Sequence, residues 1–149
     1  MTRLTNNSFI SLLFLMIPCR VSAVDFDLSV FELKGKQYQL EIADTVLRKS
    51  TGLMFRQHID QNQGMLFVYQ RSGHYKIWMK NTLIPLTVLW LDERARVIEK
   101  KLLTPCTIDP CAVYGPTNRS RFIIELKDSE YERFNINDEL LSLVNFSNQ

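Results

Sequence analysis

Apolar and polar residues alternate along most of the chain after residue 24, and this pattern predicts short strands. Residues 26–33 alternate, and residues 38–42 alternate again after the turn-forming sequence Lys34-Gly35-Lys36. A period of two on both sides of a glycine turn predicts a β-hairpin. We predict further strands at residues 64–69, 75–79, 86–91, 96–99, 122–126 and 140–144.

Two short segments carry helical signals instead. Thr45 is a residue type that caps helix N-termini, and Gly52 accepts the left-handed conformation at a helix C-terminus, which predicts a helix over 46–51. Residues 129–134 predict one further helical turn. Many short strands with one or two short helices are typical of mainly β folds. We therefore predict a single-domain β-sandwich or jelly-roll-like barrel.

The N-terminal segment has the composition of a secretory signal peptide. Arg3 supplies positive charge, an apolar run follows, and Val21-Ser22-Ala23 places small residues at the cleavage positions. We expect residues 1–23 to be removed, which leaves 24–149 as one β-rich domain in the periplasm or outside the cell. The alternative is an uncleaved anchor or a buried N-terminal helix. Pro18 argues against it because proline interrupts a continuing helix.

Composition changes this picture once the signal peptide is removed. The chain has 18 Lys and Arg residues and 16 Asp and Glu residues. Removing Arg3 and Arg20 from the 18 leaves 16 basic residues, so the remaining domain is formally neutral. No basic stripe remains, and we predict no nucleic-acid partner. Because no apolar run reaches the roughly 20 residues of a spanning helix, we also predict no stable membrane insertion after cleavage.

Two cysteines, Cys106 and Cys111, remain beyond the expected signal peptide. An even number of cysteines in an exported domain predicts a disulfide, which here would close a short proline-flanked loop. A thioredoxin-like redox pair has two intervening residues, whereas this pair has four. The two histidines, His58 and His74, show no metal-ligand spacing. We expect a structural disulfide, with free thiols as the alternative, and neither a metal nor a cofactor.

The middle of the chain contains three motifs that are more specific than any strand pattern. They are Gly52-Leu53-Met54-Phe55-Arg56, Gly64-Met65-Leu66-Phe67 and Trp78-Met79-Lys80-Asn81-Thr82-Leu83-Ile84-Pro85-Leu86. Together with Pro105-Cys106 and Tyr114, they make residues 38–140 resemble the family called domain of unknown function 192. The resemblance implies a jelly-roll type β-sandwich in a largely prokaryotic, often exported family, and it supplies no reaction. Thr87 stands where the family usually has aspartate, so no role that needs a carboxylate there carries over.

A polar cluster within the third motif is the strongest candidate site. Lys80 offers an ammonium group, Asn81 an amide and Thr82 a hydroxyl, directly after a predicted strand. Trp78 would add a flat apolar wall. The alternative is architectural, with Asn81 satisfying backbone groups in a turn and Lys80 lying along the tryptophan.

Arg56 ends the first motif and offers a guanidinium group for a carboxylate or a ligand anion. Glu125 and Asp92 are its candidate partners within the chain, and a structural ion pair is the alternative to ligand binding. The predicted ligand-binding residues are therefore Arg56, Trp78, Lys80, Asn81 and Thr82.

No catalytic motif is present. The sequence has no nucleophile elbow, zinc-protease motif, phosphate loop or dinucleotide fingerprint. We assign no catalytic residue and favour a noncatalytic binding or accessory protein of the cell envelope, with a small anion, a carbohydrate or an envelope protein as partner. The alternatives are a hydrolase of envelope polymers that uses Lys80, and a structural protein-interaction module.

Overall fold

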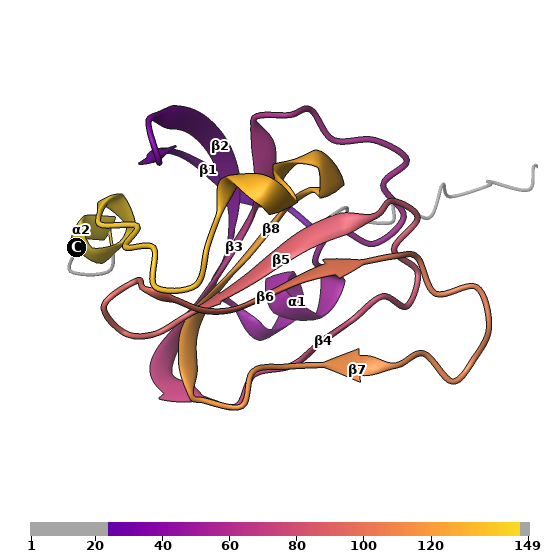
Figure 1. Ribbon diagram of the computed structural model, residues 1–149. Helices are drawn as coiled ribbons and strands as arrows, with labels where there is room; N and C mark the ends of the chain where they lie inside the picture. Colours follow the sequence, from indigo (N-terminus) through magenta and orange to yellow (C-terminus); the bar gives the residue numbers. More distant parts are fainter. Residues whose placement is uncertain (1–23, 147–149) are drawn as a thin grey trace, which may run out of the picture.

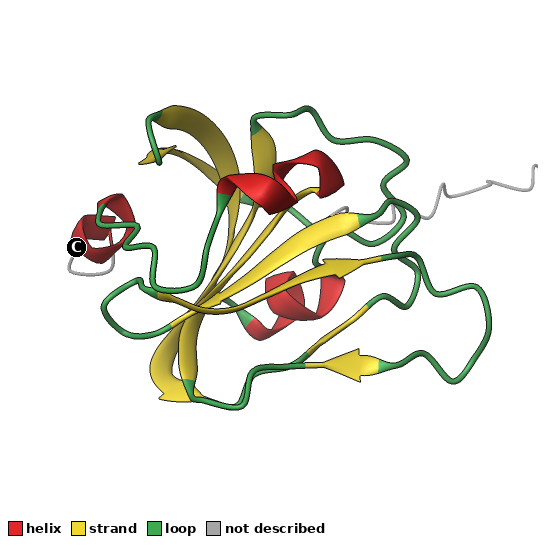
Figure 2. Ribbon diagram, viewed as in Figure 1, coloured by secondary structure: helices red, strands yellow, loops and turns green. Residues whose placement is uncertain are grey.

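A six-stranded mixed sheet forms the centre of the computed structural model, which describes residues 24–146 (Figures 1 and 2). Its strands are β1 (Asp27–Leu33), β2 (Lys36–Ala43), β3 (Gln63–Gly73), β5 (Leu86–Leu91), β6 (Val97–Leu103) and β8 (Ser120–Lys127). They lie in the order β1-β2-β3-β8-β5-β6, and all neighbours are antiparallel except β2 and β3. The predicted mainly β class is confirmed, and the sheet is open at β1 and β6 instead of closing into a barrel.

Smaller elements cover both faces of this sheet (Figure 1). Helix α1 (Val46–Thr51) and a two-stranded sheet of β4 (Ile77–Trp78) and β7 (Val113–Tyr114) lie on one side. The 3₁₀ helix η1 (Asp128–Arg133) and α2 (Ser142–Phe146) lie on the other. The molecule is therefore layered, with the sheet in the middle.

Alternation along each central strand divides the core into two apolar clusters. On β8, Phe122 and Ile124 pack in the cluster beneath η1 and α2, whereas Ile123 packs in the cluster beneath α1 and β4. Successive side chains point to opposite faces of a strand, so Glu125 shares the α1 side with Ile123. A carboxylate thus enters the apolar cluster on this face of the sheet.

The predicted hairpin and first helix are confirmed. Lys34 and Gly35 connect β1 to β2 with φ angles of 51° and 73°, as a tight hairpin turn requires. The Thr45 Oγ1 atom accepts a hydrogen bond of 3.2 Å from the Arg48 backbone N–H at the start of α1. Gly52 ends the helix with φ at 50°. The predicted helical turn near 129–134 is η1.

Thr45→Ala is expected to lower the free energy of unfolding by about 1 kcal/mol, because it removes the side-chain acceptor at the N-terminus of α1. Urea unfolding measures the change. Thr117→Ala, in an exposed loop, is the matched control and should have no effect. Equal midpoints for the wild type and Thr45→Ala would contradict this account of the cap.

Two sequence predictions at the element level are corrected. The last predicted strand, at 140–144, is wrong, because residues 142–146 form α2. Leu140 and Leu143 are nonetheless buried, and their spacing of three suits a helical turn as well as an apolar strand. The predicted strand at 75–79 shortens to β4, which pairs with β7 over two residue pairs.

The predicted signal peptide, residues 1–23, lies outside the described residues. Across residues 24–146, every helix is too short or too polar to cross a membrane.

Candidate functional site

Glu125 is a buried carboxyl group without a hydrogen-bond partner among the described residues. It pairs in register with Met65 of β3 on one side and Val88 of β5 on the other, and it is 4% exposed. Burial raises its pKa to about 8, because an ionised carboxylate loses its hydration there. The carboxyl therefore stays largely protonated at pH 7.

A small pocket of about 30 Å³ lies over this carboxyl, with room for one group the size of a water molecule. All three sequence motifs and Glu125 contribute to its wall, which consists of Lys49, Ser50, Thr51, Gly52, Leu53, Met54, Phe67, Ile77, Trp78, Thr82 and Glu125. Of the predicted ligand-binding residues, Trp78 and Thr82 line it. Thr82 is 6% exposed and Trp78 is 47% exposed, so the hydroxyl lies inside and the indole at the surface.

Gly52 lets the chain pass close over the carboxyl. A Cβ atom at this position would lie 3.5 Å from the Phe67 ring and 3.9 Å from Glu125 Oε2. Its φ of 50° also falls in the left-handed region, which favours glycine. The glycine of the first motif thus belongs to the pocket as much as to the end of α1.

The backbone beside the pocket is strained where two motifs meet. Phe55 and Asn81 both have left-handed φ angles, 63° and 57°, and the Phe55 N–H donates a hydrogen bond of 2.8 Å to the Asn81 carbonyl. Asparagine tolerates this conformation, but it is rare for a bulky side chain such as phenylalanine. Strained backbone of this kind concentrates at binding and catalytic sites. Phe55 is 68% exposed and directly follows Met54 of the pocket wall.

Two further groups near the pocket have displaced pKa values. Burial lowers the pKa of Lys49, whose Nζ donates to the Asp44 carbonyl at 2.5 Å and lies 4.8 Å from the Tyr69 ring centre. Burial, followed by the charges of Tyr75 and Glu125, raises the pKa of Tyr69 to about 12. Several displaced pKa values in one place are typical of functional sites.

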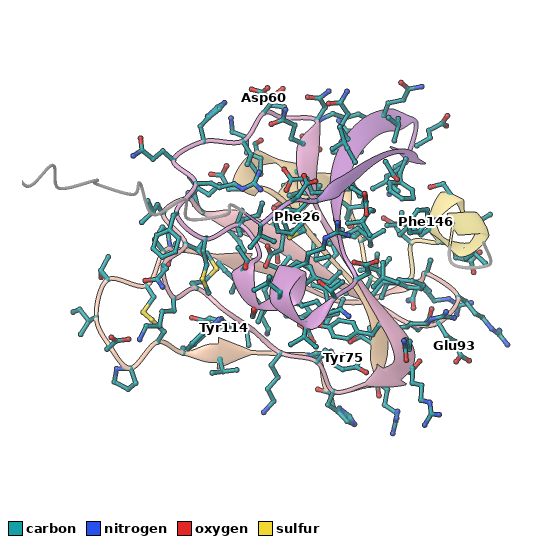
Figure 3. The ribbon with its side chains drawn as sticks, turned by 180° about the vertical axis from the view of Figure 1, so that it is seen from behind. Phe26, Asp60, Tyr75, Glu93, Tyr114 and Phe146 are labelled. Carbon is teal, nitrogen blue, oxygen red and sulfur yellow. A yellow bond between two sulfur atoms is a disulfide. The ribbon has the colours of Figure 1, made fainter. Side chains whose placement is uncertain are left out.

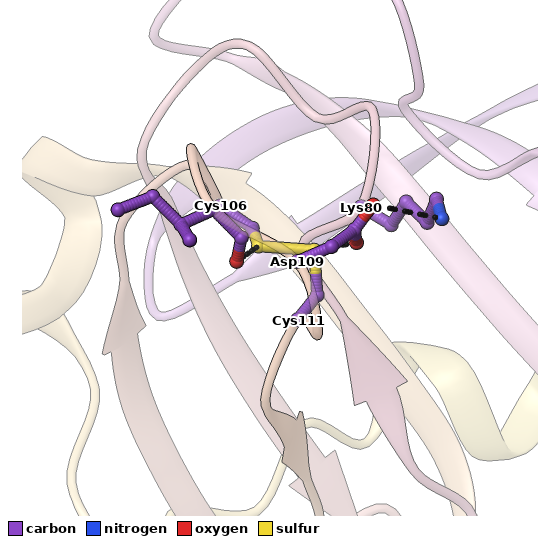
Figure 4. Close-up of a disulfide and its surroundings, with 5 residues drawn as sticks. Lys80, Cys106, Asp109 and Cys111 are labelled. Carbon is purple, nitrogen blue, oxygen red and sulfur yellow. Dashed lines mark hydrogen bonds and ion pairs between the residues drawn. A yellow bond between two sulfur atoms is a disulfide. The ribbon is translucent and has the colours of Figure 1, made fainter.

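Lys80 and Asn81 lie apart from this pocket, in a hollow of about 100 Å³ against the disulfide that joins Cys106 and Cys111 (Figure 4). Lys80 Nζ is 3.4 Å from the Asp109 carboxylate and 5.9 Å from the Trp78 ring centre. Asn81 is exposed, and its amide nitrogen lies 4.0 Å from Met54 Sδ. The structure thus separates the predicted trio, with Thr82 on one side and Lys80 and Asn81 on the other.

Arg56 forms a two-point ion pair with Glu41 of β2, at 2.6 Å and 2.5 Å. The expectation that Glu125 or Asp92 is its partner is wrong. Glu41 stands beside Met65 in the parallel register of β2 and β3. Glu125 lies on the other side of Met65, on β8, and takes no part in this ion pair.

Comparison with known protein families shows to which family the chain is related. The family model of domain of unknown function 192 (DUF192), described as "Uncharacterized ACR", matches residues 29–140. The chain belongs to this family. Two curated relatives are the UPF0127 protein TK1120 of Thermococcus kodakarensis, 31% identical over 98 residues, and a UPF0127 protein of Thermococcus gammatolerans, 30% identical over 98 residues. The alignments cover 63% of this DUF192 chain and 58% and 60% of the two relatives, so the chain spans less than two thirds of their length.

Two solved structures share the DUF192 chain's fold. A Sinorhizobium meliloti 1021 protein proposed to be a transcription regulator superposes with a TM-score of 0.64 at 20% identity, over 79% of this chain and 95% of that one. A protein of unknown function from Novosphingobium aromaticivorans DSM 12444 superposes with a TM-score of 0.62 at 22% identity, over 75% and 81%. At these identities the similarity shows the fold alone.

Proposed function

We propose that this DUF192 protein is an exported, noncatalytic binding protein of the cell envelope whose pocket holds a hydroxyl group of a carbohydrate. The observation that carries the proposal is the unpartnered, buried carboxyl of Glu125 facing the pocket. A buried polar group without a hydrogen-bond partner lowers the stability of the folded protein. A ligand that forms the missing hydrogen bonds removes this cost, and binding is favoured accordingly.

The protonation state of Glu125 selects the ligand class. With its pKa at about 8, the carboxyl is neutral at pH 7 and both donates and accepts hydrogen bonds. The Thr82 hydroxyl beside it also does both. A small anion is the weaker match, because Lys80 lies in the other hollow and the Lys49 ammonium group is directed at the Asp44 carbonyl and the Tyr69 ring. A sugar hydroxyl matches the donors and acceptors that are present.

The shape of the site agrees with this choice. A pocket of about 30 Å³ admits a hydroxyl group but not a whole ring, so the rest of the ligand must lie outside. The half-exposed Trp78 offers an apolar face there, suited to the C–H groups of a sugar ring.

Export is supported by two independent features. Residues 1–23 have the pattern of a signal peptide, and the Cys106–Cys111 disulfide is typical of oxidising compartments.

A hydrolase that uses Lys80 has less support. The Lys80 side chain is 40% exposed and paired with Asp109, so its ammonium group is neither buried nor next to the pocket carboxyl. The hydroxyls of Ser50 and Thr51 both donate to the Leu47 carbonyl at 2.9 Å within α1. The described wall of the pocket therefore lacks an activated nucleophile.

Fluorescence titration with glucose, galactose, N-acetylglucosamine and glucuronate tests the proposal, because Trp78 is half exposed and Trp90 is buried. A neutral sugar is expected to change the emission. Trp78→Ala and Glu125→Leu should each weaken binding about tenfold or more, whereas Glu125→Gln, which keeps a donor and an acceptor, should weaken it less. Leu102→Ala, an exposed apolar control on β6, should change nothing. Binding of glucuronate alone, or binding that Glu125→Leu leaves intact, would contradict the proposal.

A further inference from the structure

A cleft of about 450 Å³ lies at the end of the sheet where β3 ends, β5 turns into β6 and β8 begins. It is lined by Ser72, Asp92, Glu93, Arg94, Arg96 and Arg119. None of these residues belongs to the carbohydrate pocket, and no sequence motif includes them. Figure 3 shows Glu93 at the outside of the molecule, on the opposite side from Asp60.

Three guanidinium groups converge on this cleft with donors left over. Arg96 Nη2 donates to Glu139 at 3.0 Å, while Arg96 Nε is buried without a partner among the described residues. Arg119 donates to the Ser72 carbonyl through Nε, at 3.1 Å, and through Nη2. The side chain of Arg94 is exposed and engages no described residue.

The two acids that line the cleft do not neutralise these arginines equally. Asp92 Oδ1 accepts hydrogen bonds of 2.9 Å from the backbone N–H groups of both Arg94 and Arg96, so this carboxylate holds the turn between β5 and β6 in place. The position of this turn determines where the side chains of Arg94 and Arg96 leave the backbone. Glu93 is exposed at the rim. The lining residues carry three positive and two negative charges. Arg94 and Arg119 have no carboxylate partner among the described residues and keep free N–H donors, whereas Arg96 is paired with Glu139.

We propose that this cleft binds a phosphate group, carried either by a soluble phosphorylated molecule or by a lipid headgroup. Guanidinium forks match phosphate oxygens with two parallel hydrogen bonds. A terminal phosphate group presents three acceptor oxygens and can accept from more than one guanidinium group at once, whereas a carboxylate has two. A nucleic acid is the weaker match, because Asp92 and Glu93 place two acids among the arginines and no extended basic surface results.

The inference does not depend on the carbohydrate pocket and is tested separately. Isothermal titration at low salt, in a buffer without phosphate, uses inorganic phosphate, glycerol 3-phosphate, and vesicles of phosphatidic acid or of phosphatidylcholine. Arg94→Gln removes one charge and no described contact, so it should fold normally and weaken binding about tenfold or more. Lys127→Gln is the matched control: it removes one charge at the far end of β8, roughly 20 Å away, and should leave binding unchanged.

Two of these titrations distinguish a soluble phosphorylated ligand from a lipid headgroup. Arg94-dependent binding of glycerol 3-phosphate assigns a soluble ligand, and Arg94-dependent binding of phosphatidic acid vesicles alone assigns a headgroup. Amide chemical shifts of residues 92–96 should move in the wild-type protein in either case, which locates the phosphate without any variant. No binding below 10 mM, equal weakening by Arg94→Gln and Lys127→Gln, or binding of duplex DNA alone would overturn the proposal.

Discussion

Glu125→Gln is expected to stabilise the protein more and more as the pH rises, by on the order of 4 kcal/mol at pH 9. The folded state holds the proton of Glu125 up to a pKa of about 8, whereas an unfolded chain releases it near 4.5. Folding therefore takes up a proton between these two values. The stability that the protonated carboxyl allows is complete below pH 4.5 and is lost as the pH rises through 8. Glutamine has nearly the same shape and does not titrate, so the variant avoids the loss.

Urea unfolding of wild type and variant at pH 5, 7 and 9 measures this effect, because contributions from all other titrating groups cancel in the difference. The difference should be small at pH 5 and largest at pH 9. A difference that is the same at all three values would show that Glu125 ionises normally, and the protonated carboxyl in the proposed binding site would then be wrong.

Glu130 provides the matched control, because it is equally buried but fully partnered on the opposite face of the sheet. Burial alone would raise its pKa, but hydrogen bonds from Lys36, Tyr38 and Arg133 outweigh burial and lower it. Its ionised form therefore stabilises the fold above the unfolded pKa, and that stability is lost as the pH falls. Glu130→Gln should destabilise the protein at pH 7 and less so in acid, opposite in sign to Glu125→Gln.

Ionisation of Glu125 should affect the proposed binding as well as the stability of the fold. Above pH 8 the pocket carboxyl loses its donor and gains a charge, so carbohydrate binding should weaken in alkaline solution. A buried carboxyl without hydrogen-bond partners lowers the stability of the fold. Glu130, by contrast, is a buried glutamate whose carboxylate accepts hydrogen bonds from three side chains. The place of Glu125 in the pocket wall agrees with a role in ligand contact.

Strands and the first helix could be predicted because their signals are local. The alternation around Lys34-Gly35 and the pair Thr45 and Gly52 are read within a few residues. The C-terminal segment was mispredicted because Leu140 and Leu143 suit either a strand or a helical turn, and packing on the sheet chooses the helix.

Part of the predicted site lies in the pocket. The third motif supplies Trp78 and Thr82 to the pocket wall, but the left-handed conformation of Asn81 leaves Lys80 in a different hollow, which residue types alone do not reveal. Glu125 did carry a signal, as a charged residue inside the apolar run from Phe122 to Leu126. The arginine cleft had no recognisable sequence signal, because its residues come from three distant segments that the sheet topology brings together.

Gly64→Ala is expected to destabilise the protein by more than about 3 kcal/mol. Gly64 opens the second motif and pairs with Leu126 of β8. A Cβ atom there would lie 2.3 Å from the Glu125 carbonyl oxygen and 2.7 Å from Leu126 Cδ2. The first neighbour is backbone in the middle of a six-stranded sheet, so relief requires β3 and β8 to separate.

Gly35→Ala separates this steric effect from the general cost of replacing a glycine. A Cβ at Gly35 would meet nothing within 4 Å, but its φ of 73° is unfavourable for alanine, which costs about 1 kcal/mol. Thermal unfolding of both variants should therefore show a small loss for Gly35→Ala and a large one for Gly64→Ala. Comparable losses would mean that β3 and β8 adjust easily at Gly64. The close approach of β3 and β8 would then not explain the position of the Glu125 backbone. It would also not explain why the Glu125 carboxyl lies beneath the pocket.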